Sequence, residues 1–219
     1  MLGFAAGLSP MAQILKLPFQ ASKLGYKRVR RRCKAADPNQ LDLFTAPPAQ
    51  ILKFDSGLSP FEQALLLDER GDQRAAELYT QAIEKDDCVA DSFCNLGILE
   101  TQQGNTIKAF DCFTSALKQN PRHSEAHYNL ANLYFDQDDF RLAQLHFEMA
   151  AEFDPEFANA FFNLALVHAI NCDSGAALHA LAKYQQLVSE SEGRAAAELI
   201  ENLRMSISAA RPPRFGNTP

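Results

Sequence analysis

A period of 34 residues is the strongest constraint on the fold of this chain. Ala75, Ala109, Ala143 and Ala177 are spaced by this interval, and an Asn-Leu pair begins at residues 95, 129 and 163. Each period holds two apolar helical patterns separated by a polar turn, and Pro121 and Pro155 close two of the periods, because proline interrupts a helix. A repeat of two helices cannot bury its apolar face alone, so the spacing predicts an all-α solenoid of stacked helix pairs.

The repeated residues resemble those of a known family. Small residues at 97, 131 and 165 would let paired helices approach closely, and the phrase "SEAHYNLANLYFDQDDFRLAQLHFEMAAEFDP" continues the pattern. With these motifs the chain resembles a tetratricopeptide repeat (TPR) protein over residues 56–188. The first copy departs by one residue at its turn, and the fourth has Tyr184 where a small residue is usual. The resemblance implies a right-handed α-solenoid of about four repeats with a capping helix.

The sequence predicts three regions. Residues 1–55 are expected to be a basic, disordered arm with a proline-rich linker, and residues 209–219 a flexible tail. Ser59-Pro60 predicts the start of the first helix. The solenoid is expected over 56–208, with repeats of about 56–89, 90–123, 124–157 and 158–191 and a capping helix over about 192–208.

Charge separates the arm from the rest. Eight of the 21 basic residues lie in residues 1–34, and the remaining 13 stand against all 27 acidic residues. The arm could bind nucleic acid or anionic lipid, fold back on the acidic solenoid, or stay solvated. It also resembles an organellar transit peptide, and Met11 is an alternative start. The basic residues singled out are Lys27, Arg28, Arg30, Arg31 and Arg32.

Three asparagines occupy one place in successive repeats: Asn95, Asn129 and Asn163. The resemblance places them on first helices that line a concave groove, where an amide can donate to and accept from an extended peptide. The alternative is that these amides tie adjacent helices together and that the nearby aromatic rings are core. Those helices carry no basic residue, so a carboxylate ligand is not expected. Further groove candidates are Tyr128, Asn132, Phe135, Phe162 and Leu166.

The arm contains one short motif, "QLDLF", at Gln40, Leu41, Leu43 and Phe44. It resembles the peptides by which bacterial proteins bind the replicative sliding clamp, with apolar residues entering a pocket. This motif and the basic residues support an alternative function as a nucleic-acid- or replication-associated accessory protein. The leucines could instead dock on the solenoid of the same chain.

The sequence contains no motif for catalysis or for a cofactor. Phosphate loops, dinucleotide fingerprints and nucleophile elbows are absent. His123 and His127 are four apart, but no third ligand recurs nearby, so no metal is expected. Five cysteines without a C-x-x-C pair and no apolar run long enough to span a membrane favour a cytoplasmic protein. We therefore expect a non-catalytic scaffold or adaptor that binds a protein or peptide.

Overall fold

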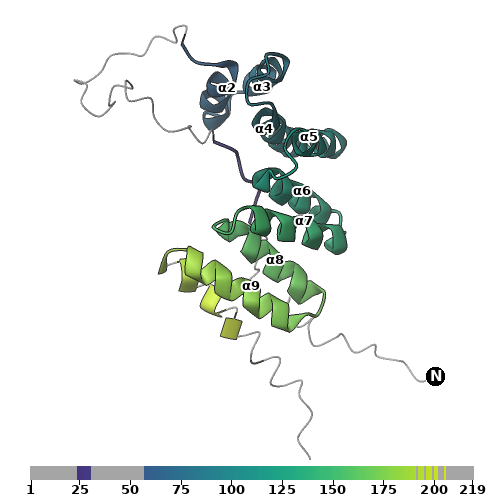
Figure 1. Cartoon of the computed structure of the whole chain (residues 1–219), viewed down its shortest axis with the longest axis vertical. Helices are drawn as coiled ribbons and strands as arrows, with labels where there is room; N and C mark the ends of the chain where they lie inside the picture. Colours follow the sequence, from purple (N-terminus) through teal and green to yellow (C-terminus); the bar gives the residue numbers. More distant parts are fainter. Residues whose placement is uncertain are drawn as a thin grey trace, which may run out of the picture. The chain divides into compact units, whose positions relative to one another are not determined.

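The computed structural model describes residues 24–30 and 57–190 continuously, together with residues 192–194, 196–198, 200, 201 and 205 (Figure 1). All the regular structure in these ranges is helical. Their contacts form two compact units. The amino-terminal unit comprises the described residues from Lys27 to Pro121, and the carboxy-terminal unit comprises Leu24–Tyr26 with the described residues from Arg122 onward.

The amino-terminal unit consists of two helical pairs in which each helix packs on the next. Its first helix begins at Ser59-Pro60, as predicted. The Ser59 hydroxyl accepts the Glu62 N–H at 3.3 Å, and the Glu62 carboxylate accepts the Ser59 N–H at 2.8 Å, which satisfies two backbone donors. The helices are α2 (Pro60–Glu69), α3 (Ala75–Glu84), α4 (Val89–Gln102) and α5 (Thr106–Gln119).

The carboxy-terminal unit repeats this arrangement. Asp139 and Asp173 cap the second helix of each pair by accepting a backbone N–H. The described residues between 192 and 205 are helical, and Ala196 and Ile200 belong to the core of this unit. The helices are α6 (Ser124–Asp136), α7 (Phe140–Phe153), α8 (Ala158–Ile170) and α9 (Ser174–Leu187).

The turn inside each helical pair has one residue with positive φ. These residues are Gly71 at 68°, Gly104 at 78°, Asp138 at 58° and Cys172 at 63°. The first interval is 33 residues and the next two are 34, so Gly71 lies one residue nearer to the repeated alanine that follows it than the others do. The whole connection between α2 and α3 is nevertheless the longest of the four. A left-handed residue lets the chain reverse directly after a helix, which explains why glycine occupies two of these positions.

The repeated small and aromatic residues form the core. Ala75, Ala109, Ala143 and Ala177 are fully buried. Gly97 on α4 lies against the Phe113 ring of α5 so closely that an added Cβ would be 2.7 Å from a ring carbon. This confirms that a small residue at this position lets the paired helices approach. No helix in the described part of the chain is long and apolar enough to cross a membrane.

Candidate functional site

In the carboxy-terminal unit, Asn163 on α8 holds an extended residue of the amino-terminal arm. Its Oδ1 accepts the Leu24 N–H at 2.8 Å, and its Nδ2 donates to the Leu24 carbonyl at 2.9 Å. The side-chain amide therefore pairs with both polar groups of one backbone residue, as a neighbouring strand would. We call this two-way pairing an amide clasp.

Side chains from α6 fix the orientation of the Asn163 amide. Its Nδ2 also donates to Asn132 Oδ1 at 2.8 Å, so both amide hydrogens are used. The Tyr128 hydroxyl lies 2.8 Å from the Leu24 carbonyl and 2.9 Å from the Gly25 carbonyl, and it serves as their donor. Burial raises the pKa of Tyr128 to about 12, so this hydroxyl keeps its proton at neutral pH.

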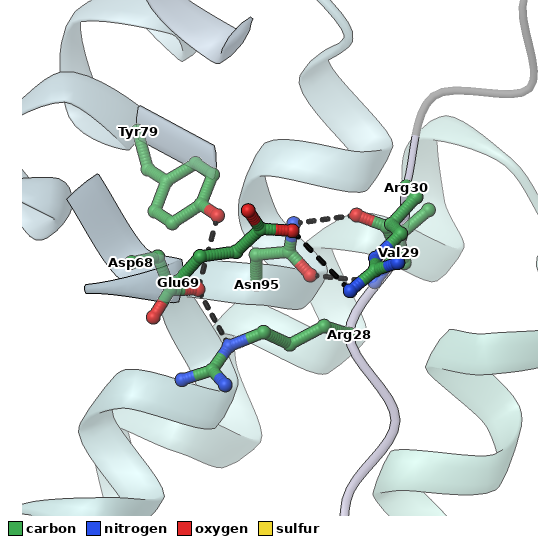
Figure 2. A network of polar contacts seen from close by, with 7 residues as sticks. All are labelled: Arg28, Val29, Arg30, Asp68, Glu69, Tyr79 and Asn95. Atoms are coloured by element: carbon green, nitrogen blue, oxygen red, sulfur yellow. Dashed lines mark hydrogen bonds and ion pairs between the residues drawn. The ribbon is translucent and has the colours of Figure 1, made fainter. Parts of the chain in front are cut away.

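A second amide clasp lies in the amino-terminal unit. Asn95 on α4 is fully buried, and its Oδ1 accepts the Val29 N–H at 2.8 Å. Its Nδ2 donates to the Val29 carbonyl at 3.0 Å, as Figure 2 shows. Val29 itself is only 6% exposed. Two asparagines at equivalent repeat positions thus make the same pair of bonds to extended backbone.

Charged side chains flank the Asn95 clasp (Figure 2). Arg28 Nε lies 2.6 Å from Asp68 Oδ2, and the Arg30 guanidinium lies 3.2 Å from a Glu69 carboxylate oxygen. The Asp68 side chain is 1% exposed, and it also accepts the Tyr79 hydroxyl at 3.1 Å. Burial, followed by the neighbouring Asp68 charge, raises the pKa of Tyr79 well above its usual range. Tyr79 therefore stays a hydrogen-bond donor to this buried carboxylate.

Three buried polar atoms near the clasps have no hydrogen-bond partner among the described residues. They are Arg28 Nε and Asp68 Oδ1 in the amino-terminal unit and Asn132 Nδ2 in the carboxy-terminal unit, and Arg28 Nε makes an ion pair with Asp68 Oδ2. Buried polar groups are normally paired, because an unpaired one loses its hydration without compensation. Beside the backbone that it holds, the amino-terminal unit therefore has one unused hydrogen-bond acceptor on α2, Asp68 Oδ1. The carboxy-terminal unit has one unused donor on α6, Asn132 Nδ2.

The expectation of a disordered arm over residues 1–55 needs correction for Leu24–Arg30. The structure describes Leu24–Tyr26 in the carboxy-terminal unit and Lys27–Arg30 in the amino-terminal unit, and in each unit one asparagine pairs with the backbone of this stretch. The Tyr26 hydroxyl adds a 2.9 Å bond to Asp136 in the carboxy-terminal unit. Among the alternatives for the arm, folding back on the acidic repeats describes this stretch. Arg31, Arg32 and the motif residues Gln40, Leu41, Leu43 and Phe44 lie outside the described residues.

The other predicted groove residues lie mainly in helix packing. Asn129 on α6 is fully buried. Phe162 is buried with its ring 5.0 Å from that of Tyr184, and Phe135 meets Phe140 edge to face at 5.3 Å. Leu166 is half-buried against the same core. Phe135 and Phe162 thus have packing roles, whereas Asn95 and Asn163 contact the backbone of the arm.

The residues Asp68, Glu69 and Tyr79 were missed by sequence reasoning about the site. Tyr79 belongs to the repeating core series, and the two acids end a helix in a chain rich in acidic residues. The separation of a basic arm from an acidic body was the available signal. It indicated attraction but could not indicate which acids receive which arginines.

The two histidines that lie four residues apart in the sequence make different contacts. His123 Nδ1 accepts the Ala126 N–H and caps α6, whereas His127 Nδ1 lies 2.9 Å from His146 Nδ1. No group of three or more potential ligands occurs in the residues that the structure describes. Burial, followed by repulsion from His127, lowers the pKa of His146 to about 4, so the His146 ring is neutral at pH 7.

Comparison with known proteins identifies the repeats. Residues 100–166 match the family model for the tetratricopeptide repeat. Human tetratricopeptide repeat protein 6 is 29% identical over 108 residues, which are 49% of this chain and 21% of that protein. The chain thus spans about a fifth of the length of this curated relative.

Two solved structures share the fold. A tetratricopeptide repeat protein from Parabacteroides merdae superposes with a TM-score of 0.57 at 21% identity, covering 68% of this chain and 60% of that one. The first TPR of Spaghetti (RPAP3), solved bound to the HSP90 peptide SRMEEVD, gives a TM-score of 0.50 at 18% identity. That match covers 54% of this chain and 93% of the other. At these identities the likeness is one of fold.

Proposed function

We propose that this chain, a tetratricopeptide repeat protein built as an α-solenoid, is a non-catalytic adaptor that binds an extended segment of a partner by its main chain. The single observation that carries the proposal is the pair of amide clasps. Asn95 and Asn163 each give two hydrogen bonds to one residue of extended backbone. We place the adaptor in the cytoplasm, as the cysteine pattern favours.

Main-chain recognition fits a surface that can exchange one segment for another. An amide clasp reads the backbone N–H and carbonyl, which every residue except proline offers, so it accepts many sequences. The unpartnered donor at Asn132 Nδ2 could pair with one more carbonyl of a different segment. The first TPR of Spaghetti, which shares the fold, was solved with a bound peptide, and this supports the same use of the fold here.

The resident segment Leu24–Arg30 is the competitor that a partner would have to displace. A tethered segment acts at an effective concentration that is about millimolar for a short flexible connection. A partner segment can therefore displace the resident one only if its affinity is high enough to compete with this effective concentration, or if the partner makes a second contact elsewhere on the protein. The resident segment would thus restrict binding to well-matched partners.

The test compares proteins captured from the native host by the full chain and three variants. One combines Asn95→Ala with Asn163→Ala, and a matched control combines Gln102→Ala on α4 with Asn171→Ala after α8, both exposed. The third, the arm-released variant, carries Arg28→Ala, Val29→Asp and Arg30→Ala. All must melt cooperatively before use.

We expect a set of partners whose capture, relative to the unchanged chain, increases with the arm-released variant and disappears with the asparagine double variant. The control variant should capture the same partners as the unchanged chain. Releasing the arm frees the asparagine amides, whereas removing those amides removes the bonds to the partner backbone. Partners captured equally by all four proteins would contradict the proposal, because neither the resident segment nor the asparagines would then lie at the binding surface.

The alternative function in replication or nucleic-acid binding gains little from the described contacts. The Arg28 and Arg30 guanidiniums lie beside carboxylates, which does not favour a phosphate-binding role. The sliding-clamp motif falls outside the described residues. The capture experiment covers this alternative too, since a clamp or nucleic-acid partner would be insensitive to the asparagine variants.

A further inference from the structure

We propose that Asp68, Glu69 and Tyr79 form an arginine-selective subsite, so that the partner segment carries the pattern Arg-aliphatic-Arg. This inference rests on the proposed function and adds the chemistry of the ligand. The resident residues Arg28, Val29 and Arg30 show how such a segment would sit.

The Asn95 clasp fixes the register of the bound segment. Because Asn95 pairs with both backbone groups of Val29, the residue before and the residue after Val29 have set positions. In extended backbone alternate side chains point to the same face. Arg28 and Arg30 accordingly meet the adjacent acids Asp68 and Glu69, while Val29 is buried (Figure 2).

Because Asp68 is buried, the segment position that Arg28 occupies favours a positively charged side chain. Its side chain is 1% exposed, and a carboxylate removed from water is destabilising unless a positive group and hydrogen bonds compensate it. The Tyr79 hydroxyl is a neutral donor and supplies one bond only. A segment that replaced the resident one without a cation at the Arg28 position would leave this charge uncompensated, so such segments are disfavoured.

Arginine suits the position better than lysine. Asp68 Oδ2 has both the Arg28 and the Tyr79 contact, whereas Oδ1 has no hydrogen-bond partner among the described residues. The planar guanidinium presents several N–H donors in a fork and can reach both oxygens of one carboxylate, which a single ammonium group matches poorly. The unpaired Oδ1 acceptor is therefore available to a guanidinium N–H, in addition to the ion pair at Oδ2.

The two arginine positions differ in environment. The Glu69 side chain is 52% exposed and that of Arg30 is 80% exposed, so solvent screens this pair. The second position should prefer a positive residue only weakly and accept lysine. Selectivity for arginine is therefore expected at the residue before the clasped one, and much less at the residue after it.

The test measures binding of the fluorescent peptide YKRVRR, the sequence of Tyr26–Arg31, to the full-length arm-released variant by anisotropy. Peptides with lysine at the first arginine, with lysine at the second, and with the same composition in scrambled order are compared. On the protein side, Asp68→Asn is matched with Glu84→Gln, which removes an exposed charge from α3 of the same unit.

We expect lysine at the first arginine, the scrambled order and Asp68→Asn each to weaken binding about 10-fold or more, as lost charge-assisted bonds do. Lysine at the second arginine and Glu84→Gln should change binding by less than about 3-fold, as screened charges do. Equal losses for both protein variants, or equal binding of the arginine and lysine peptides, would overturn the subsite and indicate attraction by overall charge.

Asn95→Ala in the arm-released variant separates this inference from the proposed function. If it weakens every peptide while arginine and lysine bind alike, the main-chain function stands and the subsite is wrong. If it changes nothing, the main-chain function is wrong. Should the arm-released variant not fold, Arg28→Lys in the otherwise unchanged chain gives the same answer. We expect the Val29 amide to exchange with deuterium about 10-fold faster there, and unchanged exchange would overturn the subsite.

Discussion

The side-chain amide of Asn95 accepts the Val29 N–H at 2.8 Å and donates to the Val29 carbonyl at 3.0 Å. Asn163 treats Leu24 in the same way with bonds of 2.8 and 2.9 Å. Asn95 and Asn163, which lie two repeat periods apart, therefore make the same two hydrogen bonds, each within its own unit. These bonds involve only backbone groups, so they do not depend on whether the bound residue is valine or leucine.

Asn95→Ala should destabilise the amino-terminal unit. Alanine cannot bond either backbone group of Val29, and leaving buried polar groups unpaired costs about 1–3 kcal/mol. Urea unfolding of the full chain measures this loss, with Gln102→Ala at the exposed carboxy-terminal end of α4 as control. Equal stability of Asn95→Ala and the control would mean that the Asn95 bonds contribute nothing to holding the segment.

Arg28→Ala should be more damaging than Asp68→Asn combined with Arg28→Ala. The single change leaves the buried Asp68 charge without its cation, and we expect it to cost about 1–3 kcal/mol, below the full value for a buried pair because Arg28 is partly exposed. The double variant has no charge left to compensate. A double-mutant cycle in urea unfolding should show coupling of about 1 kcal/mol or more, and additive effects would contradict a direct ion pair.

Gly97→Ala should destabilise the chain although alanine favours helix. An added Cβ would lie 2.7 Å from a Phe113 ring carbon, and the resulting displacement should cost about 1–3 kcal/mol. Gly175→Ala on α9 is the matched control, since its Cβ would meet nothing closer than 3.6 Å. Thermal unfolding should separate them: a lower Tm for Gly97→Ala, and an equal or higher Tm for Gly175→Ala. The same direction for both would argue against close α4–α5 packing.

Protonation of His146, which stacks on His127, should weaken the fold in mild acid. The pKa of His146 is lowered from about 6.5 in the unfolded chain to about 4, so the unfolded state binds more protons between these values. Stability should therefore fall as pH drops through this window, by about 1 kcal/mol after allowance for the partly solvated ring.

Urea unfolding at about pH 7.5 and about pH 5 measures this loss, and His146→Gln should reduce it because glutamine does not titrate. The change in unfolding free energy between the two pH values is compared for the two proteins, so the contribution of carboxylates that titrate in both cancels. An equal loss in wild type and His146→Gln would show that His146 is not responsible for the response to acid.

The repeat fold could be predicted from the sequence because its causes are local and periodic. Ala75, Ala109, Ala143 and Ala177 recur with the helical pairs, and Gly71 lies one residue nearer to Ala75 than Gly104 lies to Ala109. A residue in one repeat therefore has the same structural role as the residue 34 positions away in the next repeat. The asparagines could be selected for the same reason, together with the chemistry of an amide that donates and accepts.

The occupant and the acid partners could not be predicted in this way. Leu24 and Val29 belong to an arm without periodicity, so nothing in the pattern indicates which residues an asparagine would hold. The Arg28–Asp68 pair joins residues far apart in sequence, and many acids could have served. Aromatic rings such as Phe162 were ambiguous for another reason, since a helix face that contacts a ligand and one that contacts a neighbouring helix use the same residue types.

Residue-resolved amide hydrogen exchange at Leu24 and Val29 tests the central claim most directly. Wild type is compared with Asn163→Ala, Asn95→Ala and the control Gln102→Ala. The account predicts protection of both amides in wild type and in the control, with Leu24 exchanging faster in the first variant and Val29 in the second, each by about 10-fold or more. Rapid exchange of both amides in wild type, or protection that survives loss of the asparagines, would contradict it.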